Sequence, residues 1–106
     1  MAGDLEVAML SATFDARDGA EENLAAALAR YVVLTRNVGP CRNVDLVASA
    51  TRPGRFLVVE KWDSSDDIQA HLDSPLMTDM AQEIVPMLSA RPEIDLYDTI
   101  SAHDLA

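Results

Sequence analysis

Two predicted strands of this 106-residue chain carry apolar side chains on both of their faces. Over residues 6–14 and 55–62, successive side chains point to opposite faces, as in any strand, yet neither face is mainly polar. The apolar residues concerned are Val7, Ala8, Met9, Leu10, Ala12, Phe14, Phe56, Leu57, Val58 and Val59. A strand of this kind needs cover on both sides, which restricts the fold more than any other feature of the sequence.

The remaining elements are predicted from helical periodicity, alternation and turn residues. Leucines at helical spacing with alanines between them predict the first helix, and the short turn ending at Gly54 makes the two middle strands a hairpin. The predicted elements are a helix over 18–36, strands over 42–49 and 55–62, a short helix from 64 or 65 to 72, a helix from 75 to about 88, and a strand over 93–100.

Capping residues support these helix boundaries. Asp18 is the predicted N-cap of the first helix, with Glu21 completing a capping box. Ser64 or Ser65 is suited to cap the second helix, and Ser74 followed by proline is suited to start the third. We expect Pro86 to kink or fray the end of that helix.

The order strand–helix–strand–strand–helix–strand predicts an α+β domain with the ferredoxin-like βαββαβ fold and a four-stranded antiparallel sheet. The length fits a single domain over residues 1–106. The two long helices can cover only one face of the sheet, so the second apolar face of the sheet needs another partner. We therefore expect a homodimer that packs through the open sheet face.

Charge and cysteine content exclude several classes of partner. The formal net charge of −10 and the scattered basic residues argue against nucleic acid and anionic membrane surfaces. The acidic N-terminus is not followed by a long apolar run, so no targeting segment is predicted. The single cysteine, Cys41, has no companion for a disulfide or a metal site. These features favour a cytoplasmic protein that holds no metal.

Short motifs in the middle of the chain resemble those of a known family. Residues 53–56 read P-G-R-F, residues 60–62 read E-K-W, and residues 70–75 read A-H-L-D-S-P. Together they resemble the antibiotic biosynthesis monooxygenase family. Residues 35–41, T-R-N-V-G-P-C, resemble another family segment but transpose its glycine and proline and place valine where glutamate is common.

The resemblance implies a dimeric α+β barrel with a pocket between sheet and helices in each subunit. It also implies chemistry without metal, flavin or haem, in which a base deprotonates an electron-rich aromatic such as a quinol, anthrone or phenol and the substrate then reduces O2 itself. The expected partners are accordingly a small aromatic substrate and O2, with no cofactor. Other members of the family have different activities, so the fold alone does not settle the function.

His71 is the leading candidate for catalysis. A neutral imidazole can accept a proton near pH 7, and His71 lies beside the turn into the last helix. The alternative is a structural histidine that anchors this turn. The other histidine, His103, is predicted to be solvated in the C-terminal tail.

Glu60 and Trp62 share one face of the predicted strand over residues 55–62. A carboxylate on an otherwise apolar face needs a partner, such as a backbone donor, a tyrosine or an arginine, and it could instead serve as an acid or base. Trp62 is either core or pocket wall. The remaining residues of the predicted substrate pocket are Ser11, Tyr31, Met77, Met80 and Ile84, although helical spacing equally explains the methionines as ordinary core.

Two functions are consistent with these residues. The first is a cofactor-independent monooxygenase that oxidises an electron-rich aromatic with O2, with His71 as base or positioning group. The second is a small-molecule binding or cyclase/isomerase-type module on the same dimeric barrel, without oxygen chemistry.

Overall fold

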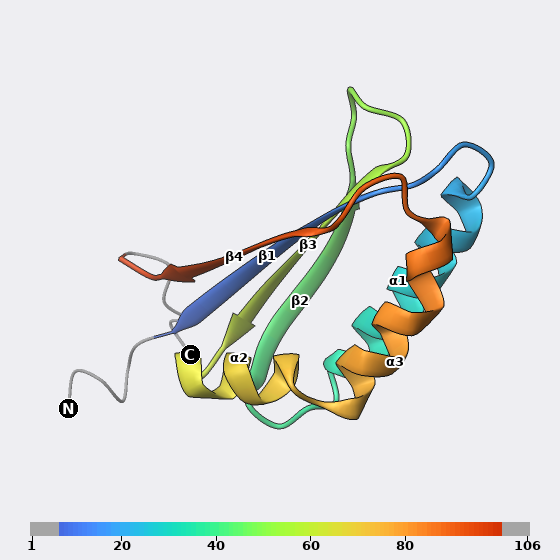
Figure 1. Cartoon of the computed structure of the whole chain (residues 1–106). Coiled ribbons are helices and arrows are strands. Elements are labelled where there is room, and N and C mark those ends of the chain that lie inside the picture. Colours follow the sequence, from blue (N-terminus) through green and yellow to red (C-terminus); the bar gives the residue numbers. More distant parts are fainter. Residues whose placement is uncertain (1–6, 101–106) are drawn as a thin grey trace.

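The computed structural model describes residues 7–100 and contains one sheet with helices on one side (Figure 1). The sheet order is β2-β3-β1-β4, and every neighbouring pair is antiparallel. This is the predicted ferredoxin-like α+β fold. In chain order the elements are β1 (Ala8–Asp15), α1 (Glu21–Thr35), β2 (Cys41–Ala48), β3 (Arg55–Trp62), α2 (Ser65–Leu72), α3 (Pro75–Ile84), the 3-10 helix η2 (Val85–Met87) and β4 (Glu93–Asp98).

The core lies between the sheet and the pair α1 and α3, which run side by side (Figure 1). In β1 every second side chain is buried, and Leu10 and Phe14 are both almost inaccessible to solvent. The register pairs Leu10 with Glu60 and Ala12 with Val58, so these side chains share the helix-covered face. The short helix α2 packs across the end of β1 and β3.

Two of the three predicted helix starts are confirmed. The side chain of Ser64 accepts a hydrogen bond from the Asp67 N–H, and that of Ser74 accepts one from the Met77 N–H. The prediction for Asp18 is wrong, because α1 begins at Glu21 and its N-cap residue makes no side-chain cap. Gly19 has a φ of +88°, which places a turn where the helix was expected to start.

A proline accounts for the C-terminal end of α3. The helix stops at Ile84 and continues as η2, which contains Pro86. The segment after α3 is then held against the end of β1, since the Arg17 N–H donates to the Met87 carbonyl at 2.8 Å and the Ser89 N–H donates to the Asp15 carbonyl at 2.9 Å. The turn from α3 towards β4 is therefore fixed by backbone hydrogen bonds.

No helix within residues 7–100 covers the second face of the sheet. Its half-buried and exposed apolar side chains include Met9, Leu57, Val59 and Val47. This face matches the open apolar surface that the sequence predicts. Within residues 7–100, no helix combines the length and the apolar character needed to span a bilayer.

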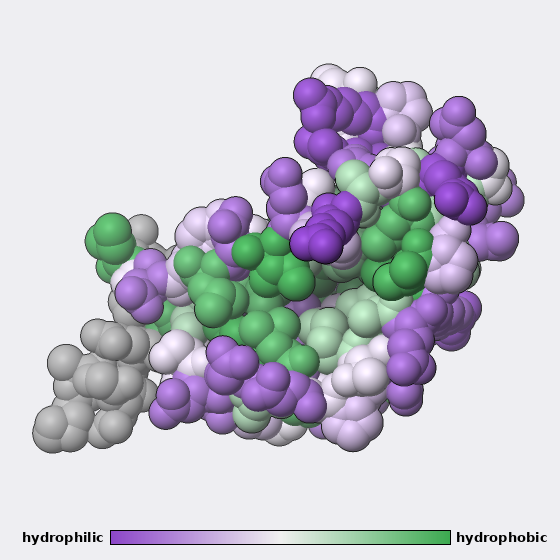
Figure 2. All heavy atoms as spheres, viewed as in Figure 1, coloured by the Kyte–Doolittle hydropathy of each residue, from purple (hydrophilic) through white to green (hydrophobic). Residues whose placement is uncertain are grey.

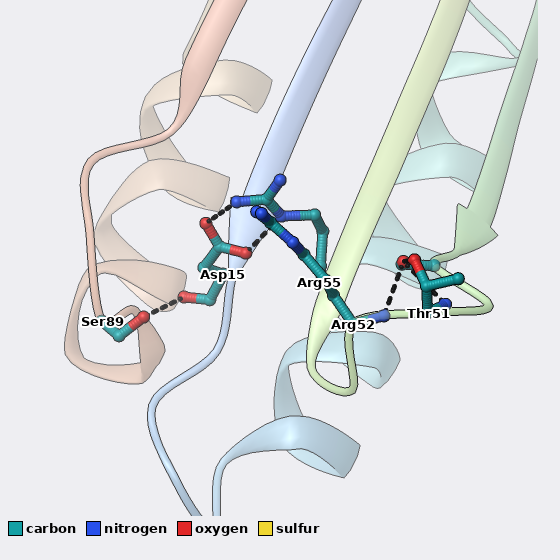
Figure 3. Close-up of polar contacts among 6 residues, drawn as sticks. Asp15, Thr51, Arg52, Arg55 and Ser89 are labelled. Atoms are coloured by element: carbon teal, nitrogen blue, oxygen red, sulfur yellow. Dashed lines mark hydrogen bonds and ion pairs between the residues drawn. The ribbon is translucent and has the colours of Figure 1, made fainter.

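An ion pair fixes the register at one end of this open face (Figure 3). Arg55 donates through Nε to Asp15 Oδ1 at 2.7 Å and through a terminal nitrogen to Oδ2 at 3.0 Å. The hydrogen bond from Arg55 lowers the pKa of Asp15 below its usual value. Ser89 donates to the Asp15 backbone carbonyl at 3.3 Å, so the pair lies where β1, β3 and the segment leading to β4 meet.

Candidate functional site

A buried polar cluster lies on the helix-covered face of the sheet. Glu60 and Trp62 come from β3, Tyr31 comes from α1 and His71 comes from α2. The Tyr31 hydroxyl donates to Glu60 Oε2 at 2.5 Å, and Trp62 Nε1 donates to Glu60 Oε1 at 2.9 Å. The same hydroxyl is 2.7 Å from His71 Nε2. Glu60 thus has the partners that a carboxylate on an apolar face requires, one of them a tyrosine.

The hydrogen count decides which groups donate. With Glu60 as a carboxylate, the single hydrogen of the Tyr31 hydroxyl is donated to Glu60, and in that arrangement His71 Nε2 supplies the hydrogen for its contact with Tyr31. Nε2 of His71 then carries a hydrogen. The resulting chain of donors runs from His71 through Tyr31 to Glu60, with Trp62 donating to the other carboxylate oxygen. This arrangement suits an ionised carboxylate.

Burial sets the protonation of the neighbours of Glu60. Desolvation raises the pKa of Tyr31 far above its usual value, and the Glu60 charge adds to this effect, so Tyr31 stays a phenol. Desolvation lowers the pKa of His71, with an opposing contribution from Glu60, whose Oε1 is 3.8 Å from Nε2. The His71 ring also packs against Trp62, with ring centroids 4.5 Å apart.

A cavity of about 150 Å³ adjoins this cluster between the sheet and α3. Tyr31 and Glu60 are the polar residues among those that line it, and the others are apolar. The side of the molecule on which β4 and α3 face each other is shown in Figure 2, where apolar residues form a band along β4 towards α3 and polar residues surround it. Val85 and Ile94, which line the cavity, are largely exposed and mark its mouth. The site is therefore an almost wholly apolar cavity that adjoins the buried Glu60 and Tyr31.

The structure brings together most of the predicted pocket residues. Those that line the cavity are Tyr31, Glu60, Met77, Met80 and Ile84. His71 and Trp62 are not among the lining residues and lie behind Tyr31 and Glu60 as their hydrogen-bond partners. Ser11 lies on the opposite face of β1, because odd-numbered residues of this strand point away from the helices, and its Oγ is 3.4 Å from the Tyr97 hydroxyl.

Several lining residues carry no chemical group that draws attention in a sequence. Leu10, Ala12 and Phe14 of β1 line the cavity, as does Ile94 of β4. The alternation along β1 could have identified them, since they share the face that pairs with Glu60 and Val58. The choice of face, however, depends on which side the helices pack.

A second hollow lies on the outer side of the helices. It has a volume of about 380 Å³ and runs between α1 and α3, where Arg30 and Glu83 form an ion pair. Tyr31 and Met80 line this groove as well as the inner cavity, so they form the partition between the two. Among residues 7–100, no three His, Cys, Asp or Glu residues group closely enough to hold a metal ion.

Comparison with known proteins agrees with this architecture. The model of the family described as antibiotic biosynthesis monooxygenase matches residues 8–83, from the first strand through α3. The chain belongs to the antibiotic biosynthesis monooxygenase family. The matched region contains Tyr31, Glu60, Trp62 and His71, so the whole polar cluster lies within the family domain.

Solved structures of similar fold come from several bacteria. The chain is similar to a putative antibiotic biosynthesis monooxygenase from Nitrosomonas europaea, with a TM-score of 0.85, 13% identity, and coverage of 92% of this chain and 94% of that one. It is also similar to a putative monooxygenase of the same name from Deinococcus radiodurans (TM-score 0.84, 21% identity, coverage 93% and 98%). Rv0793 from Mycobacterium tuberculosis has a TM-score of 0.83, 23% identity and coverage of 90% and 96%. No curated protein matches the chain.

Proposed function

We propose that this protein is a cofactor-independent monooxygenase that oxidises an electron-rich aromatic, such as a quinol, anthrone or phenol, with O2. The observation that carries the proposal is the apolar cavity that adjoins one buried carboxylate, Glu60, and the Tyr31 hydroxyl bonded to it. An apolar cavity binds a flat aromatic ligand, and a carboxylate in low-dielectric surroundings can accept its proton. Family membership supports the reaction class.

The reaction needs no further reductant, because the substrate supplies the electrons. For an activated methylene, Glu60 accepts one proton, and the carbanion transfers electrons to O2 and forms a C–O bond with it. The peroxide anion takes up a proton, and the hydroperoxide then loses water to leave a carbonyl. The overall change is CH2 + O2 → C=O + H2O. The protein's own contribution is binding, proton transfer and a cavity that excludes water.

His71 acts in this scheme through Tyr31 and not by contact with the ligand. Its Nε2 hydrogen holds the Tyr31 oxygen, which leaves the Tyr31 hydrogen directed at Glu60. We therefore assign the proton-accepting role to Glu60 and a positioning role to His71. The second subunit would cover the apolar face that carries Leu57 and Val59, so we also propose a homodimer that leaves the cavity face free.

Oxygen uptake tests the reaction. Metal-free protein is mixed with anthrone or a reduced naphthoquinol, and O2 consumption and the 18O content of the product are followed. We expect one O2 per substrate and a fall of at least about 100-fold in kcat for Glu60→Gln, the usual contribution of a general base. Glu93→Gln, a matched carboxylate exchange on the exposed start of β4, should leave the rate unchanged. Uptake no faster than in protein-free buffer across both substrates would contradict the proposal.

One observation favours the second candidate, a binding or isomerase-type module. Both Glu60 oxygens already accept hydrogen bonds, and His71 does not line the cavity, so the site could bind an aromatic or move a proton without oxygen chemistry. The two functions are distinguished in deuterated buffer without O2. Exchange of deuterium into the ligand under these conditions, followed by no consumption of O2 in air, would favour the isomerase-type module.

A further inference from the structure

The floor of the cavity is a single row of side chains across the sheet. The strand register places Ala12 of β1 between Val58 of β3 and Ile94 of β4, and all three line the cavity. Along β1 the neighbours on the same face are Leu10 and Phe14, which are also buried. Ala12 is thus the smallest side chain in this row, and it contributes to the wall of the cavity.

The polar group lies close to this floor. Glu60 pairs with Leu10 in the register, one step along the same face from the pair Ala12 and Val58. Diagonal neighbours on one face of an antiparallel pair are about 7–8 Å apart between backbones, and their side chains approach more closely. A flat ring that lies on the Ala12 methyl group would therefore have its edge near Glu60.

The volume limits what can lie there. A dry apolar cavity of about 150 Å³ is known to hold one benzene molecule, and the volume in this protein is about the same. The described lining residues include the carboxylate of Glu60 and no cationic side chain. An anionic ligand would meet the Glu60 charge without any compensating cation, so a neutral ring is favoured.

We propose that the cavity holds one neutral hydroxylated aromatic ring, that this ring lies on Ala12 with its hydroxyl group directed at Glu60, and that Ala12 is the residue that sets the depth of the site. The ligand chemistry rests on the proposed function, whereas the size limit rests on the cavity itself. Larger ligands have to extend from the mouth past Ala81 and Val85, because the floor leaves no room for a second ring beside the first.

Binding measurements without O2 test this proposal separately from turnover. Phenol, 1-naphthol and 4-hydroxybenzoate are titrated into the native protein and into Ala12→Val and Ala12→Gly variants by calorimetry. We expect native protein to bind phenol and not 4-hydroxybenzoate, Ala12→Val to weaken phenol binding at least about tenfold, and Ala12→Gly to improve 1-naphthol relative to phenol. The matched control is Ala8→Val, since Ala8 is buried on the same face of β1, pairs with Trp62 and does not line the cavity.

Ala12→Val that folds and binds phenol as tightly as native protein would overturn the proposal. If that variant does not fold, the position of bound phenol is tested by NMR on native protein labelled with 13C at its alanine methyl groups. The ring current of bound phenol should shift the Ala12 methyl resonance and leave that of Ala8 in place, and an unmoved Ala12 resonance in the presence of bound phenol would equally overturn it. If binding depends on ligand size as expected but no O2 is consumed, the monooxygenase reaction is refuted and the size limit set by Ala12 still holds.

Discussion

Glu60 and Asp15 are both carboxylates on the central strands of the sheet, yet their surroundings are opposite. Glu60 is 1% exposed on the helix-covered face, and its partners are the neutral donors Tyr31 and Trp62. Asp15 lies on the open face with about a third of its side chain exposed, and its partner is the cationic Arg55 (Figure 3). One carboxylate is held by hydrogen bonds from neutral donors, and the other by an ion pair in contact with water.

The difference in surroundings determines how much each carboxylate contributes to stability. Water screens the Asp15 pair, so its role is to fix the register at the end of β1 and its energetic weight is small. Around Glu60 water cannot replace a lost partner, because the donors of Tyr31 and Trp62 are buried too. The hydrogen bonds to Glu60 are therefore ones that only the protein can supply.

The largest expected effect comes from removing the buried carboxylate. Glu60→Ala leaves the Tyr31 hydroxyl and the Trp62 N–H without an acceptor, at about 1–3 kcal/mol for each unsatisfied donor. We expect the free energy of unfolding in urea to fall by roughly 2–6 kcal/mol, which is a large share of the typical total for a domain of this size. Glu60→Gln retains one oxygen as an acceptor and should lose about half as much. Equal stability of Glu60→Ala and native protein would show that the network is not formed.

A smaller effect is expected from the titration of His71. Burial lowers the pKa of His71 from 6.5, so below pH 6.5 the unfolded chain binds more protons than the folded one. Stability should therefore fall as the pH drops from 6.5 towards the folded pKa, by up to about 1.4 kcal/mol per pH unit. Urea unfolding between pH 7.5 and 5 measures this slope. The His71→Gln variant should lose this contribution in that window, and an unchanged slope in the variant would contradict the assignment.

The smallest effect is expected at the surface pair. Asp15→Asn removes the charge that faces Arg55, and we expect its urea midpoint to shift less than that of Glu60→Gln. Because the pKa of Asp15 is lowered in the folded protein, its contribution is present above pH 3.8 and is lost as the pH falls through the folded value. Unfolding at pH 7 in low and high salt provides the comparison. If the urea midpoint of Asp15→Asn shifted as much as that of Glu60→Gln, the expected difference in energetic weight between the two carboxylates would be wrong.

Much of the fold was predictable because local signals and tertiary packing agree. The bounds of β3, Arg55–Trp62, match the prediction. Ser64, one of two serines considered for the cap of α2, is the cap observed, and Ser74 before Pro75 caps α3 as predicted. Asp18 was assigned wrongly because an acidic residue before a glutamate suits a turn as well as a cap, and the positive φ of Gly19 decides for the turn.

The site was harder to predict than the fold. The sequence indicated that Glu60 needs a partner, yet which residue from α1 and α2 meets it depends on how the helices rotate and pack. Alternation along β1 separates Ser11 from Ala12, but it does not say which of the two faces the helices. A small apolar residue such as Ala12 has no chemistry to reveal its role, and only the packing around it shows that it leaves space.

Trp62 makes the buried cluster accessible to fluorescence measurements. It is the one tryptophan of the chain, it is fully buried, and its indole both donates to Glu60 and packs on the His71 ring. Imidazolium quenches indole emission more strongly than neutral imidazole does. We therefore expect the intrinsic fluorescence of the protein to respond to the charge of His71 without any label, and a ligand that disturbs Glu60 should change the emission when it binds.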